Sequence, residues 1–135
     1  MYKWGCPNTF PVVGTVNLDN SVSQSCFTTA VQGGSELTLQ IYQSTAYTIQ
    51  TFNLTSASID TTLTLYNDDG GFNIDYNDDI DFGAGNLASK IIYTATEDAL
   101  TTIIVNDWLC QSSSNLYGVS VCRVGPIVPT EPVVV

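Results

Sequence analysis

Hydrophobic and polar residues alternate along most of this chain, and the alternation predicts β-strands. In residues 36–41, Leu37, Leu39 and Ile41 fall on one face and polar residues fall on the other. A period of two residues is typical of antiparallel strands with one buried face. The same pattern recurs at close spacing, which predicts strands at residues 11–18, 23–31, 36–41, 46–54, 61–67, 72–78, 89–96, 100–107 and 116–124.

These eight or nine closely spaced strands predict an all-β fold, an antiparallel β-sandwich of jelly-roll or Greek-key type. Turn signals separate the strands, and the strongest is Asp69-Gly70 after the strand at 61–67. No amphipathic helix pattern competes with them. We expect residues 1–10 to form an irregular N-terminal segment, residues 11–124 to form the sandwich, and residues 125–135 to form a tail.

Composition favours one folded extracellular domain and disfavours two classes of binding partner. The 135 residues are 44% hydrophobic, which is enough to build a core. The net charge is -10, and Lys3, Lys90 and Arg123 are the only lysine and arginine residues. Nucleic acid and anionic membrane surfaces are therefore disfavoured as partners. No apolar run approaches the length of a membrane span, so we expect no membrane insertion.

The absence of histidine argues against catalysis. The chain has no histidine, which removes the commonest general base and the commonest ligand of zinc and copper. A pair of carboxylates is enough for glycoside hydrolysis, but carboxylates clustered at turns of a small sandwich make no deep cleft. We therefore expect no enzymatic activity. Trp4, Trp108 and the tyrosines either form a sugar-stacking platform or fill the core and its edges.

The acidic residues are concentrated in one stretch, which predicts a metal site. Between Asp60 and Asp81 lie seven of the 13 aspartates and glutamates. Carboxylates this dense repel one another unless water or a cation neutralises them, and oxygen ligands suit calcium. The alternative is a solvated acidic hairpin without metal. The expected calcium ligands are Asp60, Asp69, Asn77, Asp78, Asp79 and Asp81, completed by backbone carbonyls.

The four cysteines, Cys6, Cys26, Cys110 and Cys122, form an even set with no zinc-site spacing. We expect two disulfides, which implies an extracellular or cell-surface location. Three pairings are possible in principle. We favour Cys6 with Cys26 and Cys110 with Cys122, because each pair closes a local loop between neighbouring strands. The alternative is buried free thiols in a reducing compartment.

The acidic stretch and the strands after it carry a family resemblance. An aspartate, Asp60, precedes the short strand Leu63-Thr64-Leu65-Tyr66; the Asp69-Gly70 turn follows, and then the loop Asn77-Asp78-Asp79. With SKIIYTATEDALTTIIVNDW and LYGVSV, this order resembles the bacterial pre-peptidase C-terminal domain family over about residues 47–124.

The resemblance implies a small extracellular β-sandwich. Such domains are usually appended to secreted proteases and other exported proteins, and several bind calcium. The chain departs from the family pattern at Ala99, where the family often has glycine, and at Thr102, where it often has an aromatic residue. These departures concern one turn. The resemblance predicts the fold better than the function, because these domains occur in proteins with many activities.

The tail has two interpretations. Pro126, Pro129 and Pro132 remove ladder donors, so residues 126–135 cannot form an ordinary interior strand. The tail is either a linker to a larger exported protein or a donor strand that adds to the sheet edge of another copy. The sequence leaves both open.

The sequence as a whole favours a non-catalytic structural or adhesive surface module. In this interpretation calcium and disulfides stabilise the sandwich, and copies assemble into a filament through residues 126–135. The alternative function is that of an accessory domain of a secreted hydrolase, binding polysaccharide or a protein substrate. A glycan or an extracellular protein is the partner that this alternative implies.

Overall fold

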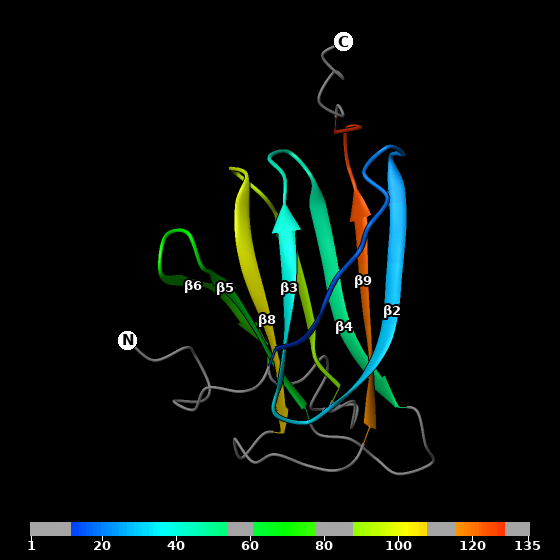
Figure 1. The fold of residues 1–135 in the computed structure, drawn as a ribbon, viewed down its shortest axis with the longest axis vertical. Helices are drawn as coiled ribbons and strands as arrows, with labels where there is room; N and C mark the ends of the chain where they lie inside the picture. The colour runs from blue at the N-terminus through cyan, green and yellow to red at the C-terminus, as the bar shows by residue number, and fades with distance from the viewer. Residues whose placement is uncertain (1–11, 54–60, 78–87, 108–115, 129–135) are drawn as a thin grey trace.

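The protein is built from β-strands in the regions that the computed structural model describes, which are residues 12–53, 61–77, 88–107 and 116–128 (Figure 1). The nine predicted strands are confirmed, and most of their ends agree within two residues. They are β1 (Val12–Thr15), β2 (Gln24–Gln32), β3 (Ser35–Ile41), β4 (Ala46–Asn53), β5 (Thr61–Asn67), β6 (Phe72–Asn77), β7 (Lys90–Thr94), β8 (Ala99–Asp107) and β9 (Leu116–Val124). No helix long and apolar enough to span a bilayer occurs in this part of the chain.

The strands form two sheets. One has the order β1-β3-β8-β5-β6, and the other has the order β2-β9-β4-β7. The predicted β-sandwich is therefore confirmed. One pairing differs from the antiparallel rule, because β1 runs parallel to β3. After Thr15 the chain makes one more bond to β3, from Val16 N–H to the Thr38 carbonyl at 2.8 Å. The connection then crosses to the second sheet, so β1 ends three residues earlier than the alternation predicts.

Strand order identifies the jelly roll among the predicted sandwich types. The antiparallel pairs are nested: β5 pairs with β6, β4 with β7, β3 with β8, and β2 with β9. Successive pairs lie in alternate sheets. The chain therefore folds as one long hairpin rolled into two layers, which is the jelly-roll arrangement. The acidic stretch lies at the innermost hairpin, β5–β6.

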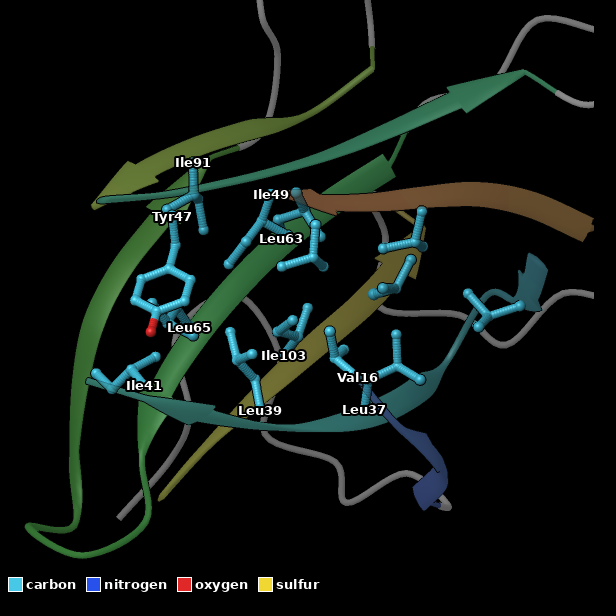
Figure 2. Close-up of a cluster of buried hydrophobic side chains, with 14 of the residues drawn as sticks. Val16, Leu37, Leu39, Ile41, Tyr47, Ile49, Leu63, Leu65, Ile91 and Ile103 are labelled. Atoms are coloured by element: carbon cyan, nitrogen blue, oxygen red, sulfur yellow. The ribbon is translucent and has the colours of Figure 1, made fainter. Parts of the chain in front are cut away.

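The core lies between the two sheets, where rows of apolar side chains run across neighbouring strands. In the first sheet Leu37, Ile103 and Leu65 occupy paired positions on β3, β8 and β5. In the second sheet Ile49 and Ile91 are paired on β4 and β7. Figure 2 shows these side chains pointing toward one another between the layers. Each such buried side chain contributes about 1.5–3 kcal/mol to folding.

The disulfide between Cys26 and Cys122 corrects the pairing that the sequence favoured. These residues lie directly opposite each other on β2 and β9, with a Cα–Cα distance of 4.1 Å. Their pairing excludes both Cys6 with Cys26 and Cys110 with Cys122. The assumption that each bond closes a local loop was wrong, because the roll makes neighbours of residues 96 positions apart. Cys6 and Cys110 themselves lie outside the described residues.

We expect the double substitution Cys26→Ala and Cys122→Ala to lower the free energy of unfolding by about 2–5 kcal/mol. The reason is that the bond closes a loop of 96 residues, and long loops lose the most entropy when the unfolded chain is cross-linked. Urea unfolding measures the change. Thr28→Ala, on the same exposed face of β2, is the control and should change little. A double variant as stable as the wild type would contradict the assignment.

Candidate functional site

The predicted calcium ligands do not all lie at one place. Asp69 lies in the turn between β5 and β6, next to the paired residues Asn67 and Phe72. Asn77 ends β6 and pairs with Leu63, near the other end of the hairpin. At about 3.3 Å per residue, the two ends are about 15 Å apart. Calcium ligands lie about 2.3–2.6 Å from the ion, so Asp69 and Asn77 cannot bind the same one.

Of the five other predicted calcium ligands, Asn77 lies among the described residues. Its Oδ1 accepts a hydrogen bond from the Lys90 backbone N–H at 2.9 Å. A carboxamide oxygen has a second lone pair, so this bond leaves Asn77 able to bind a cation. Asp60, Asp78, Asp79 and Asp81 lie outside the described residues. Among the residues that are described, no group of three or more His, Cys, Asp or Glu side chains could hold a metal.

The carboxylates of the β5–β6 turn attach this turn to β8. Asp69 Oδ2 accepts a hydrogen bond from the Leu100 backbone N–H at 2.9 Å, and Asp68 Oδ2 accepts one from the Thr102 hydroxyl at 2.6 Å. Asp68 N–H in turn donates to the Leu100 carbonyl at 2.9 Å. Gly71 completes the turn with a φ of 71°, a conformation that glycine adopts without strain. Asp68 and Asp69 therefore hold backbone and side-chain donors of the neighbouring strand.

A second acidic turn links other strands at the same end of the sandwich. Asp98 lies between β7 and β8, and its Oδ1 accepts a hydrogen bond from Gln43 N–H at 2.8 Å. The neighbouring Glu97 accepts a hydrogen bond from Asn67 Nδ2 at 3.3 Å. The sequence identified Glu97-Asp98 only as a connection. The hydrogen bond from Gln43, in the β3–β4 turn, joins Asp98 to a residue 55 positions away, and no local sequence pattern reveals such a contact.

Buried hydroxyl groups join the two sheets near the start of β5. Thr51 and Thr61 share a hydrogen bond of 2.6 Å between their hydroxyls, and Ser89 N–H donates to the Thr51 hydroxyl at 2.9 Å. The Ser89 hydroxyl also donates to the Thr61 carbonyl. All three side chains are buried. Because Asp60 directly precedes Thr61 in the chain, this network fixes the strand end at which the candidate calcium loop begins.

Arg123 is fully buried although it is one of the few cations of the chain. It faces inward on β9, in the same row as Ser25 and Tyr47. Its guanidinium donates hydrogen bonds to the carbonyl of Val22 and, at 2.7 Å, to that of Pro126. One side chain therefore fixes both the connection before β2 and the first residues after β9.

Two tyrosines belong to the core. Tyr47 and Tyr117 are buried, as the core-filling interpretation of the aromatic residues predicts. The Tyr47 hydroxyl accepts a hydrogen bond from Tyr42 N–H at 2.8 Å, and burial raises the pKa of Tyr47 above its usual value. These two rings are therefore unavailable for sugar stacking. Trp4 and Trp108 lie outside the described residues.

The segment after β9 continues the line of the strand. Gly125 N–H bonds to the Ser23 carbonyl at 3.0 Å, and Val128 N–H bonds to the Asn20 carbonyl at 2.9 Å. These partners keep the register in which Gln24 faces Val124. Residues 125–128 therefore run past the tip of β9, at the top of Figure 1, rather than folding back over the sheets.

We expect Asp69→Ala to lower the free energy of unfolding by about 1 kcal/mol, because the Leu100 N–H loses its acceptor. Asp69→Asn keeps an acceptor oxygen in place and should cost about half as much or less. Urea unfolding of both variants measures the difference. Equal losses for alanine and asparagine would show that the carboxylate acts through its charge instead.

Comparison with known proteins supports the β-sandwich fold but does not assign the chain to a family. No family model matches the chain, and no curated protein sequence matches it. A similar solved structure is PliG of Aeromonas hydrophila, a periplasmic lysozyme inhibitor of g-type lysozyme. It has a TM-score of 0.51 and 10% identity, over 85% of this chain and 95% of that one.

A second similar structure is the pre-peptidase C-terminal domain of collagenase from Bacillus anthracis. It has a TM-score of 0.48 and 10% identity, over 86% of this chain and 96% of that one. At such identities the likeness concerns the β-sandwich alone. The family named from the sequence therefore remains a resemblance.

Proposed function

We propose that this chain is a non-catalytic extracellular structural module whose copies assemble through the tail of residues 126–135, in which residues 126–128 stay on their own sandwich and residues 129–135 are donated to another copy. The Cys26–Cys122 disulfide supports the location, because such bonds persist in oxidising compartments. The absence of histidine from the sequence supports a role without catalysis. The jelly roll leaves sheet edges to which a strand can be added.

The observation that carries the proposal is the way the chain leaves the sandwich. Arg123 and the continued register hold residues 125–128 in line with β9, so the chain leaves the sandwich at a fixed point beyond that strand. Burying an arginine is costly, and the hydrogen bonds of two guanidinium nitrogens to the carbonyls of Val22 and Pro126 offset part of that cost, although Nε has no hydrogen-bond partner among the described residues. A fixed exit lowers the entropy that the tail loses when it binds a partner.

The sequence of the tail suits strand donation. Residues 133–135 are three valines, and β-branched residues favour the extended conformation. Pro132 precedes them, and proline is tolerated as the first residue of a strand. Strand addition takes its affinity from main-chain hydrogen bonds and its specificity from alternate side chains. The valines supply both backbone donors and apolar side chains.

We also propose that calcium binds Asp60, Asn77, Asp78, Asp79 and Asp81, and that Asp69 is not a ligand. Asn77 ends β6 beside the start of β5, so the chain positions directly next to these two strand ends carry Asp60 and Asp78. The crowded carboxylates would repel one another without a cation. A bound ion would stiffen the end of the sandwich where the hydroxyl network lies.

Removing the tail tests the assembly. We expect the wild-type protein to form oligomers in size-exclusion chromatography and negative-stain microscopy, and a chain truncated after Val128 to be monomeric. This truncation keeps the Pro126 carbonyl that Arg123 binds, so the sandwich should unfold at the wild-type midpoint. Replacing the three valines 133–135 by serine should have the same effect as the truncation. Oligomers that are unchanged by both variants would refute donation.

Calcium is tested by thermal unfolding with and without EDTA. We expect EDTA to lower the midpoint by several degrees, because an ion that binds only the folded state stabilises it. The double variant Asp78→Asn and Asp79→Asn should lose this shift, while Asp69→Asn should keep it. The absence of any EDTA effect on the wild type would exclude the calcium site.

A further inference from the structure

We infer that the cleft between β1 and β2 is the acceptor for residues 129–135 of a second copy. This inference rests on the proposed self-assembly and adds the surface to which the donated strand binds. The cleft has a volume of about 240 Å³ and lies where the edges of the two sheets open. Its walls include Val13 and Thr15 of β1, Phe27, Thr29 and Val31 of β2, and Leu116 of β9.

The two sides of the sandwich differ in how they are closed. On one side β6 and β7, the edge strands of the two sheets, contact each other. On the other side the edge strands are β1 and β2, and the cleft lies between them. The difference follows from length, because β1 has four residues and β2 has nine. Among the described strands, β1 is too short to cover the inner face of β2.

The cleft exposes apolar side chains that normally lie inside a sandwich. Phe27 faces inward and shares a row with Val121 and Ile49, yet it is only half-buried while those two are fully buried. At the rim, Val13 is 53% exposed and Leu116 is 49% exposed. Covering such side chains stabilises an added strand by about 25 cal/mol for each Å² of apolar surface removed from water.

The free edge of β2 supplies the backbone partners. Within the described residues β2 pairs with β9 alone, in continuous register over all nine of its residues. Its sequence, QSCFTTAVQ, contains no charge and no proline. Natural proteins usually protect long edge strands with lysine, proline or bulges. An edge strand without these devices can serve as a template for an incoming strand.

The donor has to come from another copy, because the last described residue before the tail, Val128, lies too far from the cleft. Val128 lies seven positions beyond Val121, which pairs with Phe27 at one end of the cleft. Seven residues span about 23 Å along a strand. Residues 129–135 would have to reverse direction and extend almost fully merely to reach Phe27. They could not also lie along the cleft toward Leu116.

Charge also favours this surface for contact between copies. Each copy has a net charge of -10, so most surfaces of two copies repel each other. Among the described residues that line the cleft, none is charged. The donated residues 129–135 contain one charged side chain, that of Glu131. The electrostatic repulsion between two copies is therefore small where the tail of one copy contacts the uncharged cleft of the other.

The test uses the chain truncated after Val128 and a synthetic peptide of residues 126–135. We expect the peptide to bind saturably in a titration followed by fluorescence anisotropy. Val13→Glu should weaken binding at least tenfold, because it places in the cleft a negative charge that repels Glu131 of the peptide. Val13 is already 53% exposed, so the substitution should change the unfolding midpoint little. Ile92→Glu, 64% exposed on the edge strand β7, is the matched control and should bind as before.

The same substitutions in the full chain separate this inference from the proposed function. We expect Val13→Glu to give monomers and Ile92→Glu to give wild-type oligomers. If oligomers need the tail but tolerate Val13→Glu, the tail remains the donor and the cleft is wrong as its acceptor. If the tail is dispensable while Val13→Glu still dissociates the oligomers, the copies pair through this edge of the sandwich directly and donation itself is refuted. Peptide that does not bind the truncated chain overturns the cleft as well.

Discussion

Nested strand pairing is the constraint on which the rest of this structure depends. The β5–β6 hairpin forms the innermost pair, and each further pair adds one strand on either side in sequence, out to β2 and β9. Successive pairs enter alternate sheets, so a single long hairpin produces both layers and the core between them. The outermost pair is also the one that the Cys26–Cys122 bond joins covalently. A reduction in the stability of this pair would release both ends of the roll.

The same pairing distributes the acidic residues. It separates Asp69 from Asn77 by the length of the β5–β6 hairpin, so these two residues of the acidic stretch cannot belong to a single site. At the turn, Asp68 and Asp69 accept hydrogen bonds from β8. At the other end, Asn77 accepts a hydrogen bond from the Lys90 backbone N–H, and Asp78 follows it in the sequence. Charge density in a sequence therefore indicates hydrogen-bonded turns as well as metal sites, and geometry distinguishes them.

The roll also determines which edges are free. It brings β6 and β7 together on one side and leaves the long, uncharged edge of β2 beside the short β1 on the other. Arg123 fixes the exit of the tail on the last strand of the roll. A fixed exit for the tail and an unprotected edge on the same molecule are complementary elements, which is why we relate both to assembly.

The sequence alone determined the strands and the apolar side chains that face the core, because these depend on neighbouring residues; it did not reveal that both faces of β5 are buried. The period of two placed Leu37 and Leu65 inside, and Asp69-Gly70 marked the turn after β5. Only the tertiary structure decided which strands are neighbours, and with it the partner of Cys26, the separation of Asp69 from Asn77, and the burial of Arg123. These features join residues far apart in the chain, and local pattern carries no information about which distant segments the roll brings together.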